Sequence, residues 1–200
     1  MIIRNMETKD LDKVLSIADS AFFNEELYKW TAPNDIERTV FIKAFFQFRL
    51  KDAFGKKTMQ VAVDDLGEIA GAAIWEPPIQ EDNDGEGIPP AFEEMLSKFG
   101  NDIREHCYQF ITTVLKIESY FFQPYWTLSP IFICKKMQGK GIASLLIRNQ
   151  LKKIDEKHLP CVLVTQEKNN IPIYEKYGFK TAIKVPIGES DIISYGMIRK

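Results

Sequence analysis

The stretch Gln138-Gly139-Lys140-Gly141-Ile142-Ala143 decides the fold of this chain. It follows an apolar run that ends at Ile133, and it opens an apolar-periodic segment that continues to Ile154. The pattern predicts a strand, then a glycine-rich turn, then a helix. The first N–H groups of a helix have no partner inside it, and the helix dipole favours an anion there. Because glycine allows a close approach and a positive φ, the stretch predicts a pyrophosphate-binding turn.

Two widespread phosphate-binding patterns do not match this turn. A Walker-type loop carries Gly, four residues and then Gly-Lys-Ser/Thr, whereas Gly141 follows Lys140 here. The dinucleotide fingerprint G-x-G-x-x-G needs a third glycine, and this chain has Ser144 at that position. A protein that binds a nucleotide through either pattern is therefore a weaker interpretation.

The turn fits a different pattern, Q/R-x-x-G-x-G/A, through Gln138, Gly141 and Ala143. This resembles the coenzyme-A signature of the GNAT superfamily of acyl-CoA N-acyltransferases. The alternative for these residues alone is a glycine-rich helix start that binds no ligand.

A second segment strengthens the resemblance. The apolar run at 161–165 predicts a buried strand, and residues 169–179 follow it. This segment is similar to the family motif N-x-x-x-Y-x-x-x-G-F through Asn170, Tyr174, Gly178 and Phe179. Asn170 suits the start of a short helix, and Gly178 suits its end.

Hydrophobic periodicity predicts the remaining elements. In order they are strand 1–4, helix 8–22, a loop or short helix at 24–34, helix 35–50, strands 59–63 and 69–75, a solvated acidic loop at 80–87, two helices within 89–120, a strand ending at 133, helix 142–154, strand 161–165, a helix from 170, and strands 180–185 and 192–198. The resemblance, carried by residues 125–180, implies the GNAT fold for this order: an α/β (α+β) arrangement with a mixed, mostly antiparallel sheet of six or seven strands and helices on both faces.

In that fold, the strands that precede the two motifs are parallel neighbours that splay apart, and the thiol arm of acetyl-CoA lies between them. We expect one N-acetyltransferase domain over residues 1–200. A helical insertion at about 79–123 is expected to cover the acceptor side of the sheet.

Composition excludes several classes of protein. The net charge of −2 suggests neither a nucleic-acid partner nor an anionic membrane surface. The apolar runs are too short to span a bilayer, and no signal-peptide layout is present, so we expect a cytoplasmic protein. The three cysteines lack metal-ligand spacing, which predicts free thiols and no metal. A homodimer stays open.

The resemblance implies roles for the motif residues. The pyrophosphate of acetyl-CoA is expected on the turn, and the backbone of the preceding strand is expected to hold the pantetheine arm and the thioester carbonyl. Asn170 is expected to hydrogen-bond the arm, and Tyr174 to act as the acid that protonates the departing thiolate. The cofactor-binding residues are then Ile131, Phe132, Ile133, Gln138, Gly139, Lys140, Gly141, Ile142, Ala143, Ser144 and Asn170.

The acceptor site is defined less sharply. An aromatic wall beside carboxylates suits a cationic amine. The residues expected to line it are Tyr28, Trp30, Trp75, Glu76, His106 and Trp126. Each aromatic residue is equally suited to a place in the core. Candidates for the general base are Glu25, Glu26, Glu76 and Glu118, or a chain of water molecules.

We therefore expect an acetyl-CoA-dependent N-acetyltransferase. It would transfer an acetyl group to a primary amine of a small molecule or peptide by direct attack through a tetrahedral intermediate. The alternative is a non-catalytic acyl-CoA-binding sensor or regulatory module, which would not need an acid at Tyr174.

Overall fold

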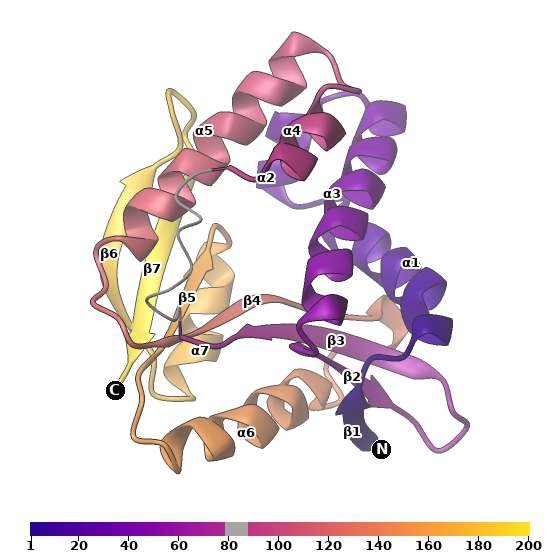
Figure 1. Ribbon diagram of the computed structural model, residues 1–200, viewed down its shortest axis with the longest axis vertical. Helices are drawn as coiled ribbons and strands as arrows, with labels where there is room; N and C mark the ends of the chain where they lie inside the picture. Colours follow the sequence, from indigo (N-terminus) through magenta and orange to yellow (C-terminus); the bar gives the residue numbers. More distant parts are fainter. Residues whose placement is uncertain (79–87) are drawn as a thin grey trace.

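A computed structural model of the chain describes residues 1–78 and 88–200 (Figure 1). Within these ranges, seven strands form one sheet in the order β1-β2-β3-β4-β5-β7-β6. Their bounds are β1 Ile2–Asn5, β2 Met59–Val63, β3 Ile69–Glu76, β4 Trp126–Ile133, β5 Cys161–Thr165, β6 Lys180–Pro186 and β7 Ile193–Arg199. Strands β4 and β5 pair in parallel, and the other neighbours pair antiparallel. The predicted mixed, mostly antiparallel sheet is confirmed.

The helices also follow the predicted order. Their bounds are α1 Leu11–Phe22, α2 Glu26–Thr31, α3 Asp35–Gly55, α4 Pro90–Leu96, α5 Asn101–Glu118, α6 Ile142–Asp155 and α7 Ile171–Glu175. Helix α3 runs to Gly55 rather than to the expected end at residue 50, because Ala53 continues the buried stripe of Phe46 and Leu50. Among the described residues, none of the helices combines the length and the apolar character needed to cross a membrane.

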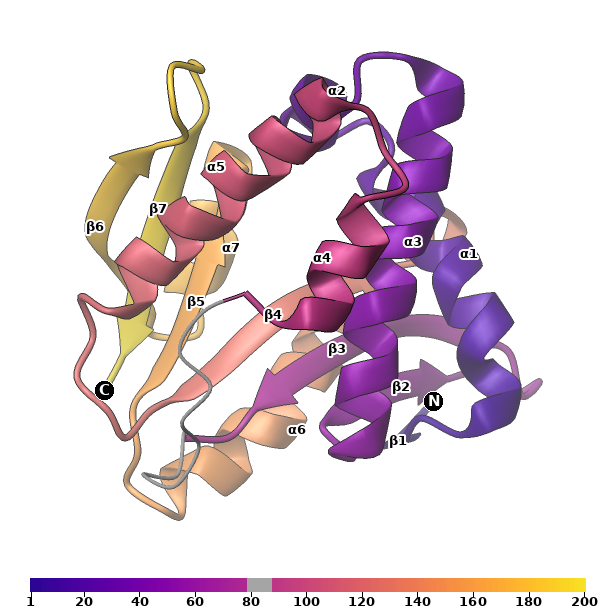
Figure 2. The ribbon, with the colours of Figure 1, turned by 45° about the horizontal axis from the view of Figure 1, so that its top comes forward.

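The helices lie on both faces of the sheet (Figures 1 and 2). Helices α1 and α3 pack on one face in a core cluster that includes Phe41, Phe46 and Phe132. Helix α6 covers the other face, in a second cluster that includes Trp75 and Leu146. Helix α5 crosses the end of the sheet formed by β6 and β7. The predicted coverage of both faces is confirmed.

Strands β4 and β5 separate after a short paired stretch. Their register joins Trp126 to Cys161 and continues only to Leu128 and Leu163 within the described residues. Beyond that point β4 stays paired with β3, whereas β5 stays paired with β7. The expected splay between the two motif strands is therefore present, and it leaves backbone groups on both strands without a ladder partner.

The segment between β3 and β4 carries helices α4 and α5, which confirms the two helices predicted there. Helix α5 packs on β6 and β7, and α4 packs on α3, so the two helices flank the splay between β4 and β5 (Figure 2). The acidic stretch at 80–87, for which a solvated loop was expected, lies outside the described residues.

Candidate active site

The glycine-rich turn has the backbone that an anion cradle requires. Gly139 and Gly141 take φ values of +76° and +79°, which non-glycine residues rarely adopt. A Cβ at either position would meet no atom within 4 Å, so open space faces both glycines. The first backbone bond into α6 runs from the Leu145 N–H to the Gly141 carbonyl. In the part of the chain that the structure describes, the N–H groups of residues 139–144 donate to no acceptor.

Side chains around this turn support the same use. The Gln138 side chain donates to the Ile133 carbonyl at 3.3 Å, which ties the turn to the end of β4. Three lysines at the turn are exposed: Lys135, Lys136 and Lys140. Free N–H groups, a helix N-terminus and nearby positive charge together fit a pyrophosphate.

The N–H groups of β4 alternate between its two sides. Cys134 donates to the Ala70 carbonyl of β3 at 2.9 Å. Because antiparallel pairing alternates along a strand, the N–H of Phe132 also faces β3, whereas those of Ile131 and Ile133 face the splay. Of the three backbone N–H groups expected to bind the pantetheine arm, only those of Ile131 and Ile133 face the splay. The ring of Phe132 instead packs in the core.

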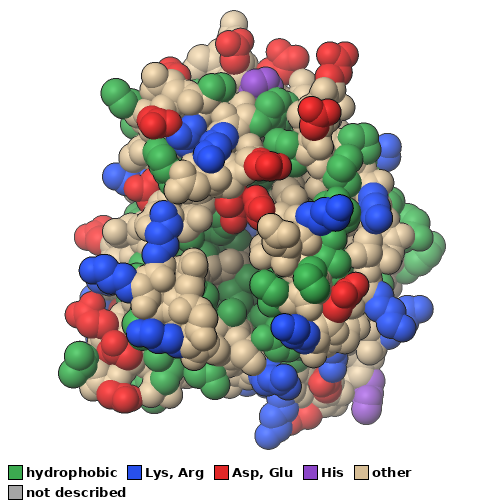
Figure 3. Space-filling model, turned by 180° about the vertical axis from the view of Figure 1, so that it is seen from behind, with side chains coloured by type: hydrophobic (Ala, Val, Ile, Leu, Met, Phe, Trp, Pro, Cys, Tyr) green, Lys and Arg blue, Asp and Glu red, His purple; other side chains and the backbone are tan. Residues whose placement is uncertain are grey.

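A cavity of about 870 Å³ lies next to the splay. Its floor comes from β4 and the end of β5, and its walls come from α1 to α5. Seen from behind, the molecule is hollowed near its centre, with hydrophobic side chains in the hollow and acidic side chains at its edge (Figure 3). Aromatic side chains dominate the walls: Phe22, Tyr28, Phe45, Phe46, Phe48, Phe92, Phe110 and Tyr174. Such a volume and lining suit a small organic ligand.

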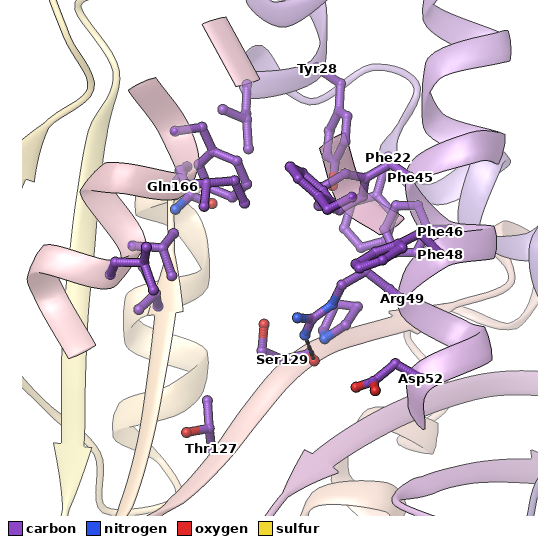
Figure 4. Close-up of a pocket in the computed structure, with 18 of the residues that line it drawn as sticks. Phe22, Tyr28, Phe45, Phe46, Phe48, Arg49, Asp52, Thr127, Ser129 and Gln166 are labelled. Atoms are coloured by element: carbon purple, nitrogen blue, oxygen red, sulfur yellow. Dashed lines mark hydrogen bonds between the residues drawn. The ribbon is translucent and has the colours of Figure 1, made fainter. Parts of the chain in front are cut away.

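Figure 4 shows how the two sides of the cavity face each other. Tyr28 and the α3 side chains point in from one side, and Gln166 points in from the end of β5. Arg49 reaches down to β4, where it donates to the Ser129 carbonyl at 2.9 Å. It also donates to the Glu76 carboxylate at 2.8 Å. These two bonds hold the guanidinium group against the cavity floor.

Tyr174 and Asn170 lie where the cavity meets the splay. Both residues line it, and both are half-buried. Burial, and then the nearby charge of Glu25, hold the pKa of Tyr174 well above its usual value. The phenol therefore stays protonated through the neutral range. Asn170 occupies the N-cap position of α7, yet its side chain makes no capping bond, which leaves the amide available to a ligand.

The closing turn of α7 fixes the place of Tyr174. Gly178 has a φ of +89°, and the Phe179 N–H donates back to the Tyr174 carbonyl at 3.4 Å. This is the bonding of a helix end closed by a left-handed glycine. The predicted role of Gly178 as the helix terminator is confirmed.

Two carboxyl groups of the cavity have strongly shifted acidity. Burial, together with the neighbouring Glu167, raises the pKa of Glu25 to about 8. Burial, together with Glu76, raises the pKa of Glu118 to about 7, against the lowering effect of Arg49. Both groups line the cavity. Glu26, another of the base candidates, is exposed and is not part of the lining.

Of the six residues expected to line the acceptor site, Tyr28 does so. Trp75 and Trp126 do not, because both side chains belong to the cluster on the α6 face, away from the cavity. Trp75 is only 1 % exposed, and the Trp126 ring lies 5.4 Å from the Lys157 ammonium. Side chains alternate across a sheet, so the expectation for these two residues was wrong.

The other expected acceptor residues also lie outside the lining. Trp30 and His106 stack on each other, with ring centroids 4.1 Å apart, where α2 meets α5. Glu76 forms an ion pair with Arg49, and Arg49 rather than Glu76 lines the cavity. The side chains that take their place are those of α3, chiefly Phe45, Phe48 and Arg49. The phenylalanine-rich sequence of this helix was the available signal.

Comparisons with known proteins agree with this geometry. Residues 116–198 match the family model described as an acetyltransferase (GNAT) domain. An uncharacterized N-acetyltransferase of Schizosaccharomyces pombe is 25% identical in an alignment of 198 positions; the match covers 90% of this chain and 74% of that protein.

Solved structures share the fold at lower identity. The Corynebacterium glutamicum structure described as histone acetyltransferase HPA2 and related acetyltransferase has a TM-score of 0.70 at 17% identity, covering 98% of this chain and 94% of its own. Arylalkylamine N-acetyltransferase 2 from Aedes aegypti has a TM-score of 0.68 at 13% identity, covering 99% and 97%. The PaiA N-acetyltransferase from Thermoplasma acidophilum, in complex with coenzyme A, has a TM-score of 0.60 at 14% identity, covering 100% and 98%. Residues 116–198 thus match a GNAT acetyltransferase domain, and the whole chain shares the fold of these acetyltransferase structures.

Proposed function

We propose that this chain transfers an acetyl group from acetyl-CoA to a primary amine of a small-molecule or peptide acceptor. The observation that carries the proposal is the convergence of Tyr174, the β4–β5 splay and an aromatic, carboxylate-bearing cavity at one place. The glycine-rich turn follows the C-terminal end of β4, toward which the splay opens, and the pyrophosphate would bind there. We also propose that residues 1–200 act as one domain, in which the 79–123 insertion forms part of the acceptor site.

Acetyl-CoA would lie along the splay as the donor substrate. Its pyrophosphate would accept hydrogen bonds from the N–H groups of residues 139–144. The pantetheine arm would continue the sheet against β4, with the N–H groups of Ile131 and Ile133 facing it. One such N–H, aimed at the thioester oxygen, would stabilise the charge that develops there. Asn170 would bind the arm from the β5 side.

The reaction needs two proton movements. The amine nitrogen bonds to the thioester carbon and loses a proton, and the carbon–sulfur bond then breaks. Tyr174 would give its proton to the departing thiolate, which leaves free coenzyme A. The raised pKa of Tyr174 weakens it as an acid, but the same dry surroundings also make a thiolate more basic.

Among the carboxylates, we propose Glu25 as the acceptor of the amine proton. Glu25 lines the cavity, and its charge contributes to the raised pKa of Tyr174, so the two groups lie near each other. The side chain of Glu25 stands at the N-cap of α2 without making a capping bond. A carboxylate with a pKa of about 8 is a stronger base than an ordinary glutamate.

The proposal is tested by incubating the protein with acetyl-CoA and a panel of primary amines, while free thiol release is followed. We expect release that depends on the amine, with the N-acetylated amine detected by mass spectrometry. Acetyl-CoA binding without release for any amine would favour the non-catalytic sensor instead.

Glu25 also sets an expected pH dependence. Because its pKa is raised, Glu25 is protonated below about pH 8 and cannot accept a proton there. We expect kcat/KM to rise with pH through this region. Glu25→Gln is expected to lower kcat by roughly 10²-fold, since a positioned general base contributes effects of that order. The neighbouring, exposed Glu26→Gln serves as the control. Identical pH profiles for the parent and Glu25→Gln would exclude Glu25 as the base.

A further inference from the structure

Glu118 is a second carboxyl group in the cavity, and the proposed reaction does not use it. It is the last residue of α5, on the insertion, and its half-buried side chain contributes to the lining. Its charged neighbours are Glu76 and Arg49, whereas the carboxylate that acts on Glu25 is Glu167. Glu25 enters the cavity from the N-cap of α2, whereas Glu118 enters it from the C-terminal end of α5. The cavity therefore carries two separate acidic positions.

Glu118 lacks a positive partner of its own. Arg49 is already engaged with the Glu76 carboxylate and the Ser129 carbonyl, at 2.8 Å and 2.9 Å. In the described ranges, the Glu118 carboxylate forms no ion pair. Residues 79–87, which those ranges omit, contain no Lys, Arg or His. Residues 79–87 therefore supply no cationic side chain that could pair with Glu118.

The lysines at the cavity also leave Glu118 uncompensated. Lys56 is paired with Asp52 at 2.9 Å. Lys51 and Lys98 are exposed, and neither is among the charges that act on the pKa of Glu118. A carboxylate removed from water without a counter-charge is costly, and a cationic ligand would relieve that cost.

The walls of the cavity favour a particular shape for such a ligand. Phe48 and Phe92 meet edge to face, with ring centroids 5.1 Å apart, and Phe110 lines the cavity from α5. These surfaces suit a methylene chain, and aromatic faces also attract a cation. A chain with a positive charge at each end would match the apolar walls and both acidic positions.

We propose that the acceptor is an aliphatic diamine, whose reacting amine lies at Glu25 and Tyr174 while its second, protonated amine pairs with Glu118. This inference rests on the proposed function and specifies its substrate class. Glu118 is a specificity-determining residue here, because it contacts the far end of the acceptor and no reacting atom. A monoamine with an apolar tail would occupy the same walls but leave Glu118 unpaired.

The test compares 1,5-diaminopentane with 1-aminohexane, in which a methyl group replaces the second ammonium group. Coenzyme A release is measured for the parent protein, for Glu118→Gln, and for Glu105→Gln, an exposed control on the same helix outside the cavity. We expect the parent to prefer the diamine in kcat/KM by roughly tenfold or more, as for a hydrogen bond between charged groups. Glu118→Gln should remove this preference by slowing the diamine alone, with acetyl-CoA affinity unchanged.

The outcomes separate this inference from the proposed function. Equal use of both amines by the parent protein would overturn the diamine assignment and leave acetyl transfer standing. A diamine preference that persists in Glu118→Gln would overturn the role of Glu118. The proposed function itself would be overturned if acetyl-CoA bound but no coenzyme A were released with these two amines and with every amine of the wider panel. Circular dichroism of each variant confirms that the fold is retained.

Discussion

The variant Tyr174→Phe is expected to lose roughly 10²-fold or more in kcat, since general acid catalysis contributes losses of that order. The aromatic ring at position 174 would remain, together with its edge-to-face contact to Phe179, in which the ring centroids lie 6.2 Å apart. The hydroxyl that we propose as the proton donor to the thiolate would be absent. Affinity for acetyl-CoA should therefore stay close to that of the parent protein. The measurement is single-turnover release of coenzyme A, with titration calorimetry for binding.

Tyr177→Phe provides the matched control for this variant. Tyr177 follows α7 by two residues, but its ring lies 5.4 Å from the Arg148 guanidinium of α6, and it is not part of the cavity lining. We expect turnover near that of the parent protein. If both tyrosine variants turned over at the parent rate under conditions where chemistry is limiting, Tyr174 would have only a packing role.

The variant Gly141→Glu is expected to abolish measurable acetyl-CoA binding. Gly141 has a φ of +79°, at the N-cap of α6, and open space faces it. A glutamate there would put a side chain and a negative charge where the pyrophosphate would accept hydrogen bonds from the free N–H groups. It would also strain the backbone, at a cost of roughly 1–2 kcal/mol. Calorimetric titration with acetyl-CoA measures the loss.

Gly67→Glu separates the strain from the loss of binding. Gly67 has a φ of +83° in the hairpin between β2 and β3, also with open space around it. The two variants should lose similar stability, whereas Gly67→Glu should still bind acetyl-CoA. Unchanged affinity in Gly141→Glu would remove the pyrophosphate from this turn.

The sequence alone was sufficient for the helices and strands and for the backbone of the glycine-rich turn. Glycines that must take positive φ, a helix that must start after them, and Gly178 at a helix end are local requirements, and local requirements are legible in a chain. The order of the strands along the chain followed from periodicity, and a mixed sheet of six or seven strands followed from the resemblance. The splay followed from the resemblance, and the register of β4 with β5 agrees with it.

The acceptor side depended on tertiary structure. Successive side chains of a strand point to opposite faces of a sheet. Trp75 and Trp126 point to the face that α6 covers, and not to the cavity. The rings of Trp30 and His106, which come from two different helices, stack on each other. Nothing local in a chain marks which helix faces will meet, because that is decided by packing between distant segments.

The acid–base groups show the same division. Glu25 and Glu118 were two of several equivalent glutamates in the sequence, and their acidity became distinct only after burial beside Glu167 and Glu76. A pKa shift depends on solvent exclusion and on charges that are remote in sequence. The sequence by itself thus determined the fold and the glycine-rich turn that we propose as the acetyl-CoA site, whereas only the tertiary structure decided which carboxylates and which aromatic side chains line the cavity.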